Sequence, residues 1–223
     1  LRPAAPWTVS AMLWPIVSAL ALVTPALRGP RQALLYCEDG AHPLAIKAAM
    51  VCLAKETRGG AAATAVEAAE METLACMLEA RNPTPEPAGS ALLNGAWDQI
   101  YTSNTVGITF GDGRSMRRKL LGPLDGRVTQ LVDQSRALYR QRIEAPPYVR
   151  GELRAKFAVS GPQTWAVSFR RFTLKALLWL PVRWRRAEYE GSWTHTYLDG
   201  NTRLMRTRRA GGGGGEFLFV LRR

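Results

Sequence analysis

Few residues of this chain have the type and spacing needed for catalysis. Its 223 residues include two histidines, His42 and His195, and no recognisable nucleophile accompanies either of them. A lone histidine in a strand-like segment, as at His195, is more often a structural polar residue than a general base. The carboxylates also form no pair with a convincing spacing for acid–base catalysis. We therefore predict that the protein is not an enzyme.

Glycine-rich segments and cysteines could in principle bind phosphate or metal. Gly-Asp-Gly at 111–113 and the five glycines at 211–215 do not connect a strand to a helix, and no Lys-Ser/Thr follows them. The three cysteines, Cys37, Cys52 and Cys76, lack the Cys-x-x-Cys spacing and the neighbouring histidines of a zinc site. We expect no phosphate loop, no metal site and no cofactor.

The positive charge lies in the second half of the chain. Residues 1–113 carry a net charge of −3, whereas residues 114–223 carry +15. A field of this sign favours anionic partners, either a lipid surface or a nucleic acid. The excess of 25 Arg over 5 Lys could also reflect a GC-rich genome, so the charge alone does not decide between these explanations.

The N-terminal segment has the composition of a targeting sequence. Residues 11–27 are apolar and are flanked by arginines, but they are short for a membrane-spanning helix and two prolines interrupt them. We expect residues 1–42 to be a targeting or disordered segment outside the fold. The alternative is an anchor on a membrane surface, which the two tryptophans near the N-terminus would assist.

Two helices are predicted after this segment, over 43–56 and 61–80, and a turn-rich stretch ends the second one. We expect Glu67, Glu70 and Glu72 to form a solvated face. The predicted stripes are Leu44, Ala48, Val51 and Lys55 on the first helix and Val66, Ala69, Thr73 and Met77 on the second, with Leu74 and Leu78 beside the second stripe. This helical segment, 43–90, is expected to pack on the remaining domain, 91–223.

From residue 92 onward the apolar pattern has a period of two, which is typical of half-buried β-strands. The predicted strands are 95–102, 127–133, 136–143, 151–159, 164–170, 172–179, 192–198, 203–209 and 216–222. Short turns without helical pattern between them predict an antiparallel up-and-down sheet. A sheet of this size closes into a barrel or folds into a sandwich.

The entry to the first strand carries a more specific pattern. Gly95-x-Trp97 is similar to the first strand of lipocalin-like barrels. Residues 78–102 resemble the plastid lipid-associated protein family, the plastid fibrillins, through Leu78, Glu79, Asn82, Pro83, Pro85, Leu92, Leu93, Gly95, Trp97, Ile100, Tyr101 and Thr102. Further matches are Gln130, Asp133, Thr196, Tyr197, Leu198, Asp199, Arg203, Leu204, Arg206, Phe219, Val220 and Leu221.

The resemblance implies a lipocalin-like barrel with Gly95, Trp97, Asp199 and Arg203 as structural motif residues. It also implies a plastid protein on the stroma-facing thylakoid or at the plastoglobule periphery. The implied function is non-enzymatic: the protein would sequester or deliver an isoprenoid or another hydrophobic lipid. Asp199 is expected to cap the turn that follows it.

Alternation along the strands predicts an aromatic interior. The inward set consists of Trp97, Tyr101, Tyr139, Phe157, Trp165, Phe169, Trp193, Tyr197, Phe217 and Phe219. An eight- or nine-stranded barrel can either be filled by such side chains or hold one small ligand. Taken with the resemblance, we expect these residues to line a lipid cavity.

A second lipid contact is predicted in residues 173–186, which are apolar and then abruptly basic. This composition suits the surface of an anionic plastid membrane or a plastoglobule. The contact residues would be Trp179, Arg183, Trp184, Arg185 and Arg186. A core strand followed by a solvated turn is the alternative.

The apolar C-terminal strand needs a partner, because an unpaired strand edge invites aggregation. We expect it to pair with the first strand and close the barrel, with Arg203 or Arg206 lying on the ring of Trp97. Two other functions stay open. A basic barrel could bind nucleic acid, although inward aromatics leave no stacking platform. The protein could also assist an enzyme of isoprenoid metabolism.

Overall fold

The computed structural model describes residues 42–104, 127–145, 149–176, 180–183, 189–209 and 215–223. Two helices, α2 (Pro43–Glu56) and α3 (Ala65–Glu79), precede a nine-stranded antiparallel sheet. Its strands are β1 (Gly95–Thr102), β2 (Arg127–Asp133), β3 (Leu138–Ala145), β4 (Val149–Val159), β5 (Thr164–Ala176), β6 (Leu180–Arg183), β7 (Tyr189–Leu198), β8 (Thr202–Arg209) and β9 (Phe217–Arg222).

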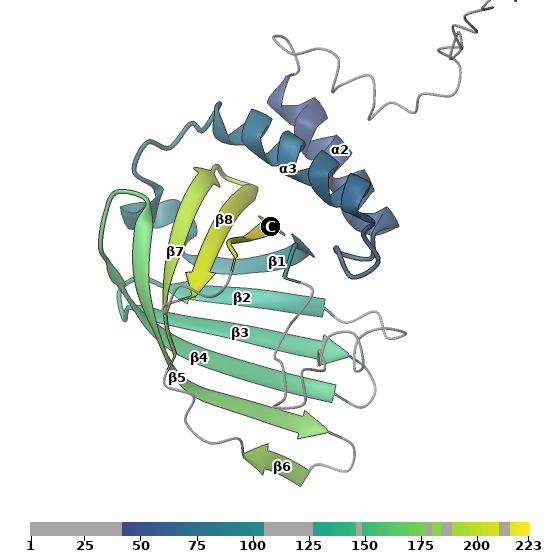
Figure 1. Ribbon diagram of the computed structural model, residues 1–223. Coiled ribbons are helices and arrows are strands. Elements are labelled where there is room, and N and C mark those ends of the chain that lie inside the picture. The colour runs from purple at the N-terminus through teal and green to yellow at the C-terminus, as the bar shows by residue number, and fades with distance from the viewer. Residues whose placement is uncertain (1–41, 105–126, 146–148, 177–179, 184–188, 210–214) are drawn as a thin grey trace, which may run out of the picture.

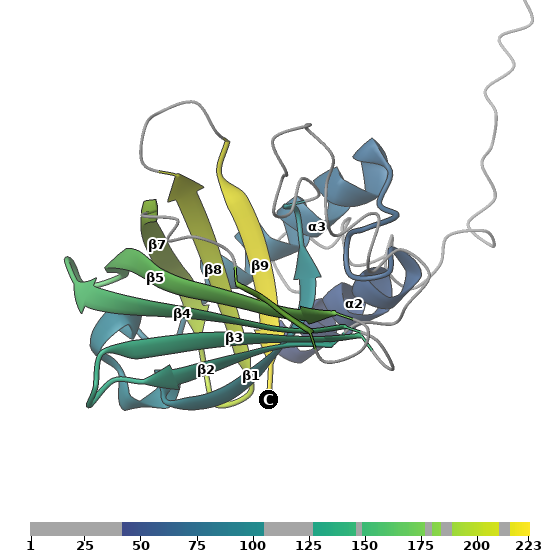
Figure 2. The ribbon, with the colours of Figure 1, turned by 90° about the horizontal axis from the view of Figure 1, so that it is seen from below.

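Eight of these strands close into a barrel. The order β4-β3-β2-β1-β9-β8-β7-β5 becomes a ring because β4 also pairs with β5, while β6 pairs only with the C-terminal half of β5. In Figure 2, β7, β8 and β9 run side by side and cross the direction of β2–β5. The predicted mainly-β, antiparallel barrel preceded by two helices is confirmed.

The C-terminal strand closes this barrel as predicted. β9 pairs with β1 on one side, through Asp98 opposite Arg222 and Thr102 opposite Phe219. On its other side it pairs with β8 along its whole length. The apolar end of the chain is therefore held between two strands, and neither of its edges is left open.

The segment predicted as two strands, 164–170 and 172–179, is one long strand instead. β5 continues from Thr164 to Ala176, and a register shift opposite Arg154 and Ala155 marks a β-bulge within it. A bulge adds one unpaired residue and bends the strand without ending it. The period of two is interrupted at such a residue, which explains the false boundary.

The first helix has the predicted bounds, while the second begins later than predicted. α3 starts at Ala65 because Thr64 caps it: its hydroxyl accepts from the backbone N–H of Glu67, whose carboxylate accepts from the N–H of Thr64. This Thr-x-x-Glu capping box is a recognised helix start. The glycine-containing turn at 57–64 precedes the helix, so the predicted start at residue 61 is wrong.

The buried face of α2 differs from the predicted stripe, whereas the buried face of α3 includes Leu74 and Leu78, which were predicted to lie beside its stripe. The predicted residues Leu44 and Val66 are 67% and 78% exposed. The buried residues are instead Ile46, Ala49, Met50, Leu53 and Ala54 on α2 and Met71, Leu74, Ala75 and Leu78 on α3. Alanine-rich helices carry apolar side chains on several faces, so periodicity alone did not identify the face that meets the sheet.

The helices pack on the outer side of the barrel wall (Figure 1). One hydrophobic cluster joins their buried faces to outward-facing residues of four strands, namely Tyr101, Tyr197, Leu204, Leu218 and Val220. β1 and β7–β9 therefore have apolar side chains on both faces, one set facing the helices and one set facing the barrel interior.

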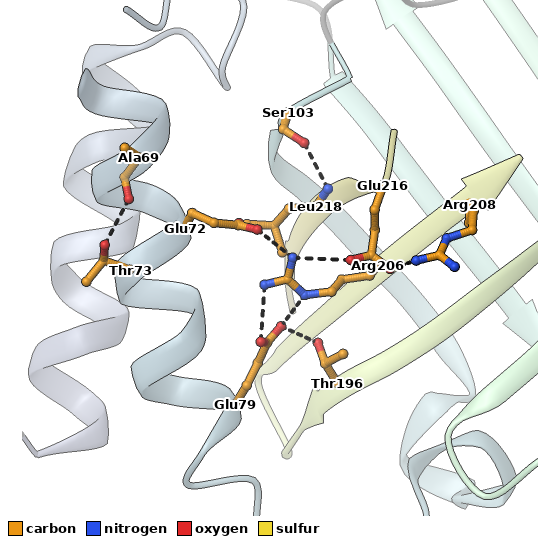
Figure 3. Close-up of polar contacts among 10 residues, drawn as sticks. All are labelled: Ala69, Glu72, Thr73, Glu79, Ser103, Thr196, Arg206, Arg208, Glu216 and Leu218. Atoms are coloured by element: carbon orange, nitrogen blue, oxygen red, sulfur yellow. Dashed lines mark hydrogen bonds and ion pairs between the residues drawn. The ribbon is translucent and has the colours of Figure 1, made fainter. Parts of the chain in front are cut away.

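A charged cluster fastens α3 to β8 beside this apolar contact (Figure 3). The guanidinium of Arg206 donates to both carboxylate oxygens of Glu79, at 2.9 and 3.1 Å, and to Glu72 at 2.5 Å. Thr196 on β7 donates to the same Glu79 carboxylate at 2.6 Å. Glu72 was predicted to be solvated, and its side chain is 47% exposed, but it also forms an ion pair with Arg206, 134 residues away in the sequence.

The turn between the helices touches the end of β1 at a glycine. Gly60 has a φ of +89°, and a Cβ built on it would lie 2.3 Å from the carbonyl oxygen of Thr102. We expect Gly60→Ala to lower the free energy of unfolding by about 2–4 kcal/mol, since both the backbone conformation and the contact become strained. Urea denaturation would measure the change.

Gly89→Ala is the matched control for this prediction. A Cβ at Gly89 would have no heavy atom within 4 Å, so its substitution is expected to change stability by less than about 0.5 kcal/mol. Equal effects of the two substitutions would show that the Gly60 contact has no special role.

The helices are not of the membrane-spanning kind. Within the ranges that the structure describes, no helix has the length and apolar character to cross a membrane. The buried faces of α2 and α3 are covered by the sheet instead.

Candidate functional site

The barrel interior is the candidate site, and its wall is set by the alternation of the strands. One hydrophobic cluster lies on its inner face and consists of Ala88, Leu93, Trp97, Val132, Tyr139, Ala155, Phe157, Trp165, Val167, Trp193, Leu198, Met205 and Leu221. Phe169 and Phe219 pack against this cluster and are only partly buried. The interior therefore combines a dense part with a part that is more accessible.

The dense part lies at the end of the barrel where the chain enters. Two short 3₁₀ helices, Pro87–Gly89 and Ala91–Leu93, cover this end. The indole N–H of Trp97 donates to the carbonyl of Leu93 at 2.9 Å, and that of Trp165 donates to the carbonyl of Ala88 at 2.8 Å. Both indoles are fully buried, so these hydrogen bonds satisfy polar groups that water cannot reach.

Aromatic contacts continue from this closed end along the interior. The Phe157 and Trp165 rings are stacked with centroids 3.9 Å apart, and Tyr139 meets Trp193 edge-on at 4.7 Å. Phe169 lies next to Trp193 at 5.8 Å. β5 and β9 place Phe169, Phe217 and Phe219 several residues from the closed end, and all three are only partly buried.

Two of the predicted interior residues lie elsewhere. Tyr101 and Tyr197 belong to the cluster that faces the helices. A register shift between Gln99 and Tyr101 and another between His195 and Tyr197 invert the alternation just before each tyrosine. A bulge moves every following side chain to the other face of the sheet.

The other predicted aromatics line the interior. Trp97, Tyr139, Phe157, Trp165, Phe169, Trp193 and Phe219 are members of the interior cluster or pack against it. Phe217 alternates with Leu218, which faces the helices, and pairs with Thr207, so it shares the inward face with Phe219. Whether these residues contact a ligand stays a prediction.

The arginine on Trp97 is not one of the two that were predicted. Arg223 lies over the Trp97 ring at 4.2 Å, and its guanidinium donates to the backbone carbonyls of Leu92 and Asn94. Arg203 lies instead over Trp165 at 5.5 Å, and Arg206 binds α3. Gly95 adopts a φ of +108° at the start of β1, close to the Arg223 side chain.

Polar residues also line the interior, and the sequence pattern did not identify them as a group. Arg203 and His195 are both fully buried, and Arg203 Nε donates to His195 Nδ1 at 3.3 Å. Gln130 is fully buried as well, and its strand partners are Trp97 and Gln141. The signal was present in β2, where Gln130 stands between Val128 and Val132 on the apolar face.

Burial changes the protonation of these groups. Burial, together with the charge of Arg203, holds the pKa of His195 well below its ordinary value, so its imidazole is neutral. Burial lowers the pKa of Arg203 to about 10. The guanidinium is therefore still protonated at neutral pH, and it places a positive charge in the barrel interior.

Asp199 connects the β7–β8 turn to α2. Its Oδ1 accepts from the backbone N–H groups of Asn201 and Thr202 at 2.9 and 2.8 Å, which is the turn-capping geometry expected from sequence. Its Oδ2 accepts from the Tyr197 hydroxyl at 2.7 Å and from Lys47 Nζ. Burial acts to raise the pKa of Asp199, but these hydrogen bonds outweigh it and the pKa lies below its ordinary value.

Asp199 is therefore expected to make stability acid-sensitive. A carboxyl whose pKa is lower in the folded state stabilises that state above the unfolded pKa of about 4, and this contribution is lost as the pH falls through the folded pKa. Asp199→Asn is expected to be less stable at pH 7 and to lose less stability than the wild type between about pH 4 and pH 2. Urea midpoints across this range would measure both.

Glu86→Gln, which removes an exposed carboxylate, serves as the control and is expected to leave the acid profile unchanged. A wild-type profile that Asp199→Asn reproduces at every pH would contradict the predicted role of this carboxylate.

The predicted membrane-contact residues cannot be placed. Trp179, Trp184, Arg185 and Arg186 lie outside the described residues, and Arg183 ends β6 with only its backbone described. A different basic surface is present on the outer faces of β3 and β4, which we call the basic wall. It consists of Arg140, Arg142, Arg150, Arg154 and Lys156, with Glu144 and Glu152 among them.

Only one of these basic residues, Arg154, has an ion pair among the described residues, with Glu152. The basic wall therefore keeps an excess of exposed positive charge. Within the described part of the chain, no group of three or more His, Cys, Asp or Glu side chains is arranged to hold a metal ion.

Two comparisons relate this chain to known proteins. The family model PAP_fibrillin matches residues 45–222, which include α3, all nine strands and α2 except for its first two residues. Probable plastid-lipid-associated protein 5, chloroplastic, from Arabidopsis thaliana, is 30% identical over 166 residues. The match covers 73% of this chain and 62% of that relative, so this chain corresponds to somewhat less than two thirds of the relative's length.

Proposed function

Since this chain belongs to the PAP_fibrillin family, we propose that it is a plastid lipid-associated protein whose barrel holds a hydrophobic lipid. The observation that carries the proposal is that the burial of the inward-facing aromatic side chains decreases from one end of the barrel to the other. Trp97 and Trp165 close one end, whereas Phe169 and Phe219 are inward-facing and yet partly exposed at the other. Apolar side chains that point into a barrel and remain accessible offer contact area to an apolar ligand.

The exposed positive charge of the basic wall supports a location at an anionic membrane surface. Its arginines would attract the anionic headgroups of a plastid membrane, each contributing about 1 kcal/mol near the surface. The chloroplastic relative, with its name, supports a plastid location. We propose that the protein works at the stroma-facing thylakoid or at the plastoglobule periphery, where it sequesters or delivers isoprenoids or other lipids without catalysing a reaction. An enzyme of isoprenoid metabolism is a further proposed partner.

Loading with β-carotene tests the interior. Trp193 is next to Phe169, so a carotenoid held in the barrel is expected to quench tryptophan fluorescence in proportion to its binding. Phe169→Asp would place a charge on the inward face and is expected to weaken loading at least about tenfold, because a carboxylate is costly to bury beside an apolar ligand.

Ser168→Asp is the matched control, since Ser168 precedes Phe169 on the same strand and points to the opposite face. It is expected to load β-carotene like the wild type. Equal loss in both variants would mean that the effect is not in the barrel interior. If the wild type binds neither β-carotene nor any other neutral lipid, the proposed function is wrong.

Flotation with liposomes tests the basic wall separately. Wild-type protein is expected to float with vesicles containing phosphatidylglycerol and to be released by salt, because exposed charges are screened. Arg140→Glu combined with Arg142→Glu should abolish flotation. The charge-matched control, Lys55→Glu with Arg58→Glu, changes exposed residues of the helical segment and should float normally. Binding that ignores salt and anionic lipid would refute the docking step.

A further inference from the structure

The buried guanidinium of Arg203 lacks the partner that such a charge normally has. Its Nε donates to His195, its Nη2 donates to the Met205 sulfur at 3.2 Å, and Nη1 has no hydrogen-bond partner among the described residues. None of the described carboxylates forms an ion pair with it. A buried charge without a counter-charge destabilises a fold by several kcal/mol.

His195 adds a second donor to the same place. Because Nδ1 of the neutral imidazole accepts from Arg203, the proton of the ring is on Nε2. This Nε2–H is buried and also has no partner in the described part of the protein. Two adjacent residues thus each have one buried N–H group without a hydrogen-bond partner among the described residues.

Further unpartnered amide atoms belong to the same interior wall. Both polar atoms of the Gln130 side chain, Nε2 and Oε1, are buried without a hydrogen-bond partner among the described residues. The same holds for the side-chain oxygen Oε1 of Gln99. Gln99 faces Leu221, a member of the interior cluster, and Leu221 pairs with Arg203 on its other side. Tyr139 is also near enough for its hydroxyl and the Arg203 charge to influence each other.

A purely hydrocarbon ligand would leave this arrangement unexplained. Each buried polar group without a hydrogen bond costs about 1–3 kcal/mol, so a container for carotenes alone would be more stable with apolar residues at these positions. A ligand with an acidic headgroup would supply what is missing. Its oxygens would accept from Arg203 and His195, and its charge would neutralise the guanidinium.

We propose that the barrel binds a long-chain carboxylic acid of the fatty-acid class, with its carboxylate at Arg203 and His195 near the closed end. This inference rests on the proposed function and specifies its ligand. The chain of the acid would extend along the aromatic interior toward the partly buried residues Phe169 and Phe219.

Oleate, compared with its methyl ester, is the direct test. The two molecules have the same chain, but only oleate carries a negative charge. We expect the wild type to bind oleate about tenfold to a hundredfold more tightly than methyl oleate, as one charge-assisted hydrogen bond in a buried site would provide. Binding is measured by displacement of cis-parinaric acid methyl ester, a neutral fluorescent probe, with each competitor below its aggregation limit.

Arg203→Met should remove this preference. The variant keeps a long side chain without the charge, and removal of an unpaired buried charge need not destabilise the fold. We expect its affinities for oleate and methyl oleate to become equal within about twofold. The matched control is Arg208→Met, because Arg208 lies on the same strand but is exposed. It should retain the wild-type ratio.

The outcomes separate this inference from the proposed function. If the wild type binds methyl oleate and oleate equally, the acid site is refuted, while lipid binding in the barrel stands. If neither ligand nor the neutral probe binds, the proposed function fails together with it. If Arg203→Met does not fold, the wild-type ratio alone decides. A preference that persists in folded Arg203→Met would also overturn the assignment.

Discussion

Deletion of residues 217–223 is expected to abolish the cooperative unfolding transition of this protein. The deletion removes β9, which pairs with β1 and β8 and buries Leu218, Val220 and Leu221. It would open two strand edges and expose parts of both hydrophobic clusters, since Leu218 and Val220 face the helices and Leu221 faces the interior. Three fully buried aliphatic side chains alone contribute roughly 5–9 kcal/mol, as much as a typical domain's whole stability.

Near-ultraviolet circular dichroism during urea titration would measure this loss, because the fixed environments of the buried tryptophans produce the signal. A synthetic peptide of residues 215–223 provides the control. When it is added to the truncated chain, it is expected to restore part of the signal by filling the vacant position between β1 and β8. A truncated chain that unfolds cooperatively at the wild-type urea midpoint would refute closure by the last strand.

Trp165→Ala is expected to lower the free energy of unfolding even more than Gly60→Ala. Trp165 is fully buried, stacks on Phe157 and meets His195 at 4.3 Å, and its N–H bonds to Ala88. Truncation would leave a cavity at the closed end and remove the shorter of two hydrogen bonds to the Ala88 carbonyl, the other coming from the Gln134 amide. We expect the free energy of unfolding to fall by about 3–5 kcal/mol, measured by chemical denaturation.

Two further variants separate the contribution of the indole N–H from that of ring packing. Trp165→Phe keeps an aromatic ring but loses the N–H, and is expected to cost about 1–3 kcal/mol. Val159 is the cross-strand partner of Trp165, but the Val159 side chain is 54% exposed. We therefore expect Val159→Ala to lower the free energy of unfolding by less than about 1 kcal/mol. If Trp165→Ala were no worse than Val159→Ala, the closed end would not be a packed plug.

Local residue chemistry was enough to predict much of the fold. The bounds of α2, β1 and β2 agree with the sequence prediction, because Pro43 begins a helix, alternation marks a strand, and glycine or proline separates them. The pairing of β1 with β9 also followed from sequence, since an apolar terminal strand needs a partner on a closed sheet. Most of the interior aromatics could be identified because side chains alternate between the two faces of a strand.

The face on which a side chain lies was harder to predict from the sequence where a bulge interrupts the alternation of a strand. The bulges before Tyr101 and Tyr197 turn these tyrosines toward the helices, and no residue type in the sequence indicates either bulge. The predicted stripe of α2 was also wrong, and on α3 the buried face is centred on Leu74 and Leu78 beside the predicted stripe, because a helix rich in alanine has several apolar faces and only the sheet selects one.

The partners of the arginines show this limit most clearly. The sequence by itself determined a basic, aromatic, antiparallel barrel with joined ends. Only the tertiary structure decided that Arg203 is buried beside His195, that Arg206 binds α3 and that Arg223 covers Trp97. Strand patterns arise from neighbours along the chain, whereas the partner of a long charged side chain depends on contacts between residues that are distant in sequence.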